Sequence, residues 1–90
     1  MKASVWKSGG GKWHCACTDD LANNSGNSYI LARCLGMKPA EYILWVVNNF
    51  NYDSFYVSDD YSLFYFVFKT ESQARYFMKE VNKRLKKKGY

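Results

Sequence analysis

The sequence predicts an α+β fold: a small, four-stranded, mainly antiparallel sheet of two hairpins, with two or three helices packed on one face. Two strand-like segments flanking a glycine loop near the N-terminus, and an alternating aromatic segment over residues 62–68, predict the sheet. An apolar stripe at spacings of three and four predicts a C-terminal amphipathic helix. A chain of 90 residues suits a single domain, 1–90.

The first hairpin is expected over residues 3–17. Residues 3–8 and 12–17 suit strands, and Gly9-Gly10-Gly11 between them can supply the positive φ angles of a short loop. Trp13, Cys15 and Cys17 alternate and would share one face.

Helices are expected in the middle of the chain. Thr18-Asp19-Asp20 offers N-cap chemistry, but loop residues 23–27 interrupt the helix that would follow. A second start at Asn27 or Ser28 leads to a helix that Gly36 would end as its left-handed cap.

Pro39 suits the first turn of a further helix, over 39–50. The run from Tyr42 to Val47 is also β-branched enough for a strand, in which case Asn48-Asn49 would form a hairpin turn, so the sequence leaves helix and strand open here.

The second hairpin is expected over 54–58 and 62–68, around the turn Asp59-Asp60-Tyr61. In the later strand, aromatic or aliphatic side chains occupy both faces, with Phe64, Phe66 and Phe68 on one of them. Such a strand is central in a sheet, or it presents an aromatic surface to a partner.

The C-terminal helix has the clearest signals. Thr70 and Gln73 form a capping box, and Glu71/Arg75 and Glu80/Arg84 are favourable pairs four residues apart. The buried stripe is expected to contain Ala74, Phe77, Met78, Val81 and Leu85. The outward face is expected to carry Arg75, Lys79, Lys83 and Lys86, followed by Lys87 and Lys88.

The net charge of +5 is unevenly distributed: +3 over residues 1–17, −4 over 18–60 and +6 over 61–90. A basic end on an acidic middle favours an anionic partner met at that end. The alternative is that the lysines form a solvated face that keeps an aromatic-rich protein soluble.

The three cysteines, Cys15, Cys17 and Cys34, are spaced unlike a disulfide framework or a zinc site, and we interpret them as core thiols. His14 is the only histidine and would face away from Cys15 on a strand. We therefore expect no metal, no cofactor and no enzymatic activity. No apolar run is long enough for a membrane span or a signal peptide, so we expect a cytoplasmic protein.

Residues 32–37, Ala-Arg-Cys-Leu-Gly-Met, with Tyr42 and Trp45 further on, resemble the helix-turn-helix of DNA-binding repressors. The resemblance covers about 20 residues, and a hairpin and helix follow, as in winged variants. It implies a DNA-binding fold, but the second helix offers few of the outward basic side chains that reach bases.

Residues 64–70, leading into Ala74-Arg75, are similar to the third strand and second helix of RNA-recognition-motif domains. The resemblance implies that Phe64 and Phe66 stack bases. The sequence departs from the family at Tyr65, where a small residue is expected, and in the order of its first two strands.

The sequence therefore predicts a non-catalytic binding protein that docks on nucleic acid or a nucleoprotein complex. The contacts are expected from Arg75, Lys79, Lys83, Arg84, Lys86, Lys87 and Lys88. A phage-type inhibitor of host machinery, such as an anti-CRISPR protein, is compatible with this composition. The alternative is a protein–protein or self-associating module that uses the aromatic strand 62–68 and the apolar helix 39–50.

Overall fold

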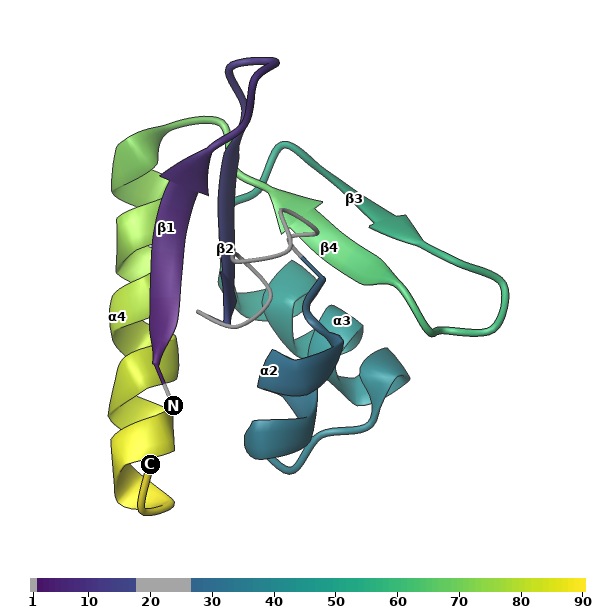
Figure 1. Ribbon diagram of the computed structural model, residues 1–90, viewed down its shortest axis with the longest axis vertical. Coiled ribbons are helices and arrows are strands. Elements are labelled where there is room, and N and C mark those ends of the chain that lie inside the picture. The colour runs from purple at the N-terminus through teal and green to yellow at the C-terminus, as the bar shows by residue number, and fades with distance from the viewer. Residues whose placement is uncertain (1, 18–26) are drawn as a thin grey trace.

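The computed structural model describes residues 2–17 and 27–90, and it confirms the α+β fold (Figure 1). Within these residues the elements follow one another as two strands, two helices, two strands and a helix. Their bounds are β1 (Ala3–Lys7), β2 (Trp13–Cys17), α2 (Tyr29–Cys34), α3 (Pro39–Asn49), β3 (Ser54–Val57), β4 (Phe64–Val67) and α4 (Glu71–Lys87). The helix start expected at residues 18–20 lies outside the described residues.

Both predicted hairpins are confirmed. β1 pairs antiparallel with β2, and β3 pairs antiparallel with β4. In the first hairpin Gly11 has φ of 79°, which is the left-handed backbone that the glycine loop was expected to supply.

The four strands form two separate two-stranded sheets rather than one continuous ladder. Among the described residues the two sheets share one backbone bridge, where the Phe68 N–H donates to the Trp13 carbonyl at 2.8 Å. The opposite end of β4 is bonded elsewhere, since the Phe64 carbonyl accepts from the Ser28 N–H (2.8 Å) and the Phe64 N–H donates to Asn27 Oδ1 (3.3 Å). The chain entering α2 therefore uses backbone groups that would continue the ladder.

Residues 42–47 are helical, which resolves the question that the sequence left open. Pro39 occupies the first turn of α3, and Glu41 Oε1 accepts from the Lys38 N–H at 3.2 Å. Gly36 follows α2 with φ of 74°, as expected for a left-handed cap. The helix start signals thus outweigh the β-branched residues of this segment.

Tyr42 and Phe77 are the centres of the core, and both are fully buried. The Tyr42 ring contacts the rings of Phe64, Phe66 and Phe77, with centroids 5.7–6.4 Å apart. The core therefore joins one face of β4 to α3 and α4.

α4 also closes the edge of β1. The Ala3 N–H donates to Asn82 Oδ1 at 2.8 Å, and Asn82 Nδ2 donates to the Ala3 carbonyl at 3.2 Å. The Asn82 side chain thus takes the place of a neighbouring strand, and α4 is held along the first hairpin. None of the described helices combines the length and the apolar character that a membrane span requires.

Candidate nucleic-acid interface

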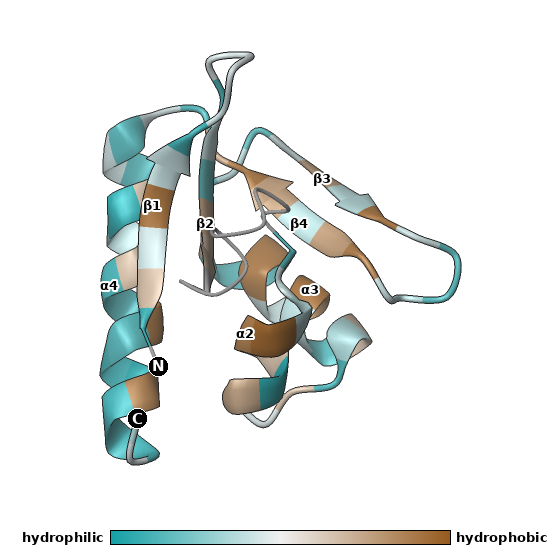
Figure 2. Ribbon diagram, viewed as in Figure 1, coloured by the Kyte–Doolittle hydropathy of each residue, from teal (hydrophilic) through white to brown (hydrophobic). Residues whose placement is uncertain are grey.

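α4 positions the predicted basic residues. Thr70 Oγ1 accepts from the Gln73 N–H at 3.2 Å, which confirms the N-cap, and Gln73 Oε1 accepts from the Lys69 N–H at 3.2 Å. The residues that α4 buries completely are Ala74, Phe77, Val81 and Leu85. Figure 2 shows the result as a largely hydrophilic helix along one side of the molecule.

All seven predicted basic residues are exposed, and two of them form ion pairs with neighbours on the helix. Arg75 contacts Glu71 at 3.2 Å, as predicted. The predicted pair of Glu80 with Arg84 is wrong, because Glu80 contacts Lys83 at 3.5 Å instead. Exposed pairs of this kind contribute less than about 1 kcal/mol, so both cations can exchange their partners for a phosphate.

Arg84 lies on a different side of α4 from the outward row. Its guanidinium carbon lies 5.0 Å from the centre of the Trp45 ring on α3, a cation–π contact. Lys88 approaches the turn after α2, with Nζ 3.3 Å from the point that a Cβ at Gly36 would occupy. Two of the seven predicted basic residues, Arg84 and Lys88, therefore lie on the side of the molecule that faces α2 and α3.

Four of the remaining cations follow the outer side of α4, whereas Lys87 also borders the pocket that Arg84 and Lys88 form with Leu35 and Met37. By the 100° turn per residue of an α-helix, the outward row falls within about 80° of the helix circumference. The row contains Arg75, Lys79, Lys83 and Lys86. The last turn adds Lys87, and basic side chains there also complement the negative end of the helix dipole.

The structure contradicts the prediction that Phe64 and Phe66 contact bases. Their exposed fractions are 0% and 2%, and both rings pack against Tyr42. α3 and α4 cover this face of β4, so neither ring is available to a partner in the folded protein.

The other face of β4 carries a row of rings that stack on one another. Trp6 stacks on His14 (centroids 4.8 Å apart), His14 meets the edge of Tyr65 (5.7 Å), and Tyr65 stacks on Tyr56 (5.6 Å). The row links all four strands. The row joins the two hairpins, and Tyr56 at its end is 48% exposed.

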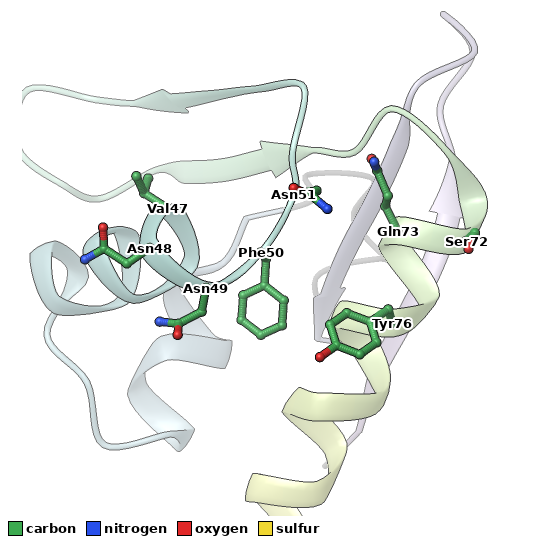
Figure 3. A pocket seen from close by; sticks show the side chains of 8 residues that line it. All are labelled: Val47, Asn48, Asn49, Phe50, Asn51, Ser72, Gln73 and Tyr76. Atoms are coloured by element: carbon green, nitrogen blue, oxygen red, sulfur yellow. The ribbon is translucent and has the colours of Figure 1, made fainter.

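A groove of about 580 Å³ lies between the end of α3 and the start of α4 (Figure 3). The Phe50 and Tyr76 rings lie together in it, with centroids 5.9 Å apart. Its lining is uncharged and rich in amides: Val47, Asn48, Asn49, Phe50, Asn51, Ser72, Gln73 and Tyr76. The sequence did not predict this groove, because the asparagines on their own indicate only a helix end or a turn.

A second, apolar depression of about 520 Å³ lies between α3 and the second hairpin. Leu44, Phe55 and Tyr61 line it with exposed fractions of 61%, 44% and 45%. Of the predicted self-association surface, the outer side of helix 39–50 is thus exposed. The predicted strand 62–68 is mostly buried, and the neighbouring strand β3 supplies the exposed ring.

The turn before β4 holds Tyr61 at the edge of this depression. Asp60 Oδ1 accepts from Ser62 Oγ (2.7 Å), from the Ser62 N–H (3.1 Å) and from Ser58 Oγ (2.9 Å). These hydrogen bonds lower the pKa of Asp60 to about 2. Tyr61 itself has φ of 59°, a conformation that aromatic residues rarely adopt, so the turn fixes it at some cost in backbone strain.

The cysteine and histidine side chains do not converge on a metal site in the part of the chain that the structure describes. Cys15 is buried, which raises the pKa of its thiol to about 12, and it is therefore protonated at neutral pH. Burial and the nearby Lys12 lower the pKa of His14.

Comparison with known protein families, with curated proteins and with solved structures gives no match for this chain.

Proposed function

We propose that this is a non-catalytic binding protein that docks on nucleic acid, free or within a nucleoprotein complex, through the outer side of α4. The observation that carries the proposal is the row of exposed cations, Arg75, Lys79, Lys83 and Lys86, with Lys87 beyond it. Only Glu71 and Glu80 oppose them on the helix, each within an exposed ion pair. A small inhibitor or adaptor that acts on a nucleoprotein complex, such as a phage-type anti-CRISPR protein, is one form of this function.

The cations favour phosphate contacts over base reading. Lysine acts as a point charge on phosphate, whereas bidentate recognition of a base edge is the work of arginine. The chain has three arginines, and Arg84 lies against Trp45. Contacts from this helix face should therefore tolerate many sequences and weaken with salt.

Neutralising three of these lysines tests the proposal. Lys79→Gln, Lys83→Gln and Lys86→Gln together should weaken binding to a labelled 12-nucleotide strand by about 10- to 100-fold at 150 mM salt, since three phosphate contacts are lost. The measurement is fluorescence anisotropy against DNA and RNA oligonucleotides.

The matched control changes Lys7, Lys12 and Lys38 to Gln, which gives the same net charge away from α4. We expect the control to lose less than about 3-fold, an effect of net charge alone. Equal losses in the two triple variants would mean that binding follows the overall charge, and the α4 interface would be rejected.

The apolar depression supports a second candidate function, docking of a protein segment. Acidic residues are neighbours of its lining residues in the sequence, with Glu41 after Ala40 on α3 and Asp59 and Asp60 before Tyr61, while Leu44 and Phe55 are exposed in it. Like charges disfavour a second copy bound through the same surface. We therefore infer a partner segment with large apolar side chains flanked by Lys or Arg.

Selection from a displayed peptide library tests this surface. Enriched peptides should combine apolar anchors with basic flanks, and Leu44→Glu should weaken them at least 10-fold, because it places a charge in the depression. Tyr90→Glu, at another exposed ring, is the control. Enrichment of acidic peptides, or of peptides that bind Leu44→Glu equally well, would exclude this candidate.

A further inference from the structure

The amide-lined groove has the chemistry of a site for a flat, neutral ligand. None of its eight lining residues is charged. Phe50 and Tyr76 provide ring surface, and the Tyr76 side chain is 58% exposed. The side chains around the rings can donate and accept hydrogen bonds, and Figure 3 shows that they come from the end of α3, the loop after it and the start of α4.

Several of these polar side chains have hydrogen-bond donors or acceptors that the protein itself does not use. Asn49 Nδ2 donates to the Trp45 carbonyl at 2.8 Å, which leaves its Oδ1 as an acceptor. Gln73 Oε1 accepts from Lys69, which leaves its Nε2 as a donor. The side-chain amide of Asn51 makes no hydrogen bond to other described residues. The groove thus offers both the hydrogen-bond donors and the hydrogen-bond acceptors that the edge of a nucleobase requires.

The groove also adjoins the basic row. Tyr76 and Lys83 are seven residues apart, two helical turns, and so lie on the same line of the α4 surface, about 10 Å apart along the axis. Arg75 and Lys79 lie one residue before and three residues after Tyr76. A ligand that places a flat ring against Tyr76 would therefore meet these cations if it carried phosphates. A neutral sugar would leave them unused.

We propose that the groove takes up an unstacked base of single-stranded nucleic acid whose phosphates follow α4. The inference rests on the proposed function and narrows its ligand to single-stranded nucleic acid. A paired base lies inside the stack of the duplex and cannot enter the groove beside α4. Base stacking on an exposed ring tolerates all four bases, and the amides would add preference among them. The protein should then prefer single strands over a duplex of the same sequence.

The test compares a 12-nucleotide single strand with its duplex, for wild type and for Tyr76→Ala, by anisotropy at 50 mM salt. Wild type should bind the single strand at least 5-fold more tightly. Tyr76→Ala should weaken single-strand binding by about 5- to 150-fold, the range for loss of one stacked base. Its affinity for the duplex should stay within about 2-fold of wild type.

Three controls separate stacking from folding. Tyr76→Phe keeps the ring and should bind like wild type. Tyr76→Leu keeps an apolar cover over Phe50 but should bind as weakly as Tyr76→Ala. Tyr56→Ala, at an exposed ring on β3, should leave affinity unchanged.

The outcomes distinguish this inference from the proposed function. Binding of both forms with equal affinity, unaffected by Tyr76→Ala, would overturn the groove and leave the α4 interface standing. A loss for Tyr76→Ala that is equal on single strand and duplex would also overturn it. No binding to either form at 50 mM salt would remove the proposed function, and the groove assignment with it.

Discussion

Phe77→Ala is expected to lower the free energy of unfolding by about 3–5 kcal/mol, the usual cost of removing a buried aromatic ring. Phe77 is fully buried, and its ring contacts Tyr42, Trp45, Phe50 and Phe68 at centroid distances of 4.8–6.4 Å. These rings come from α3, the loop after it and the residue that follows β4. A cavity at this point therefore loosens α4 from the rest of the fold. Urea unfolding followed by circular dichroism measures the loss.

The neighbouring residue provides the control, since Tyr76→Ala removes an exposed ring and should cost less than about 1 kcal/mol. If Phe77→Ala is unfolded outright, Phe77→Leu should still fold, at a cost nearer 1–2 kcal/mol. A loss below about 1 kcal/mol for Phe77→Ala would contradict the central position assigned to this ring.

Stability is expected to fall steeply above pH 9. Burial raises the pKa of the Cys15 thiol from 9.0 to about 12, and burial also raises the pKa of Tyr42 far above its ordinary value of 10.0. At a pH between the ordinary pKa and the raised pKa of each group, the unfolded chain has lost that group's proton while the folded chain retains it. Each group then costs about 1.4 kcal/mol of stability per pH unit.

At pH 11 the two groups together should remove about 4 kcal/mol relative to pH 8, about 3 from Cys15 and about 1 from Tyr42. Urea unfolding at pH 8, 9, 10 and 11 measures this. Cys15→Ala lacks the thiol, so its stability should fall by about 3 kcal/mol less over the same range. A Cys15→Ala profile parallel to that of wild type would show that the thiol is not buried as described.

Local sequence signals predicted the elements because each element has its own start, stop or period. The Thr70 cap and the apolar spacing identify α4, the glycine loop identifies the first hairpin, and Pro39 marks the start of α3. These features depend on neighbours within a few residues. The division of the strands into two sheets depends instead on Ser28 reaching Phe64, a contact between distant segments.

The site was predicted less completely, because it also depends on contacts between segments that are distant in the sequence. Alternation along β4 separates Phe64 and Phe66 from Tyr65, but it does not say which face the helices cover, and the resemblance to RNA-recognition motifs selected the buried face. The groove needs Asn51 and Tyr76 together, from segments that only the tertiary fold joins. The basic row was predictable because helical spacing alone places Arg75, Lys79, Lys83 and Lys86 on one side.

The central claim is that α4 binds nucleic acid through phosphate contacts, and the salt dependence of binding tests it most directly. The association constant of the wild-type protein for a 12-nucleotide single strand would be measured by anisotropy from 50 to 300 mM salt. Contacts from at least four of the α4 cations predict a slope of log K against log salt of about −3, since each contact with single-stranded nucleic acid contributes about −0.7. A slope flatter than about −1, or no binding at 50 mM salt, would contradict the account.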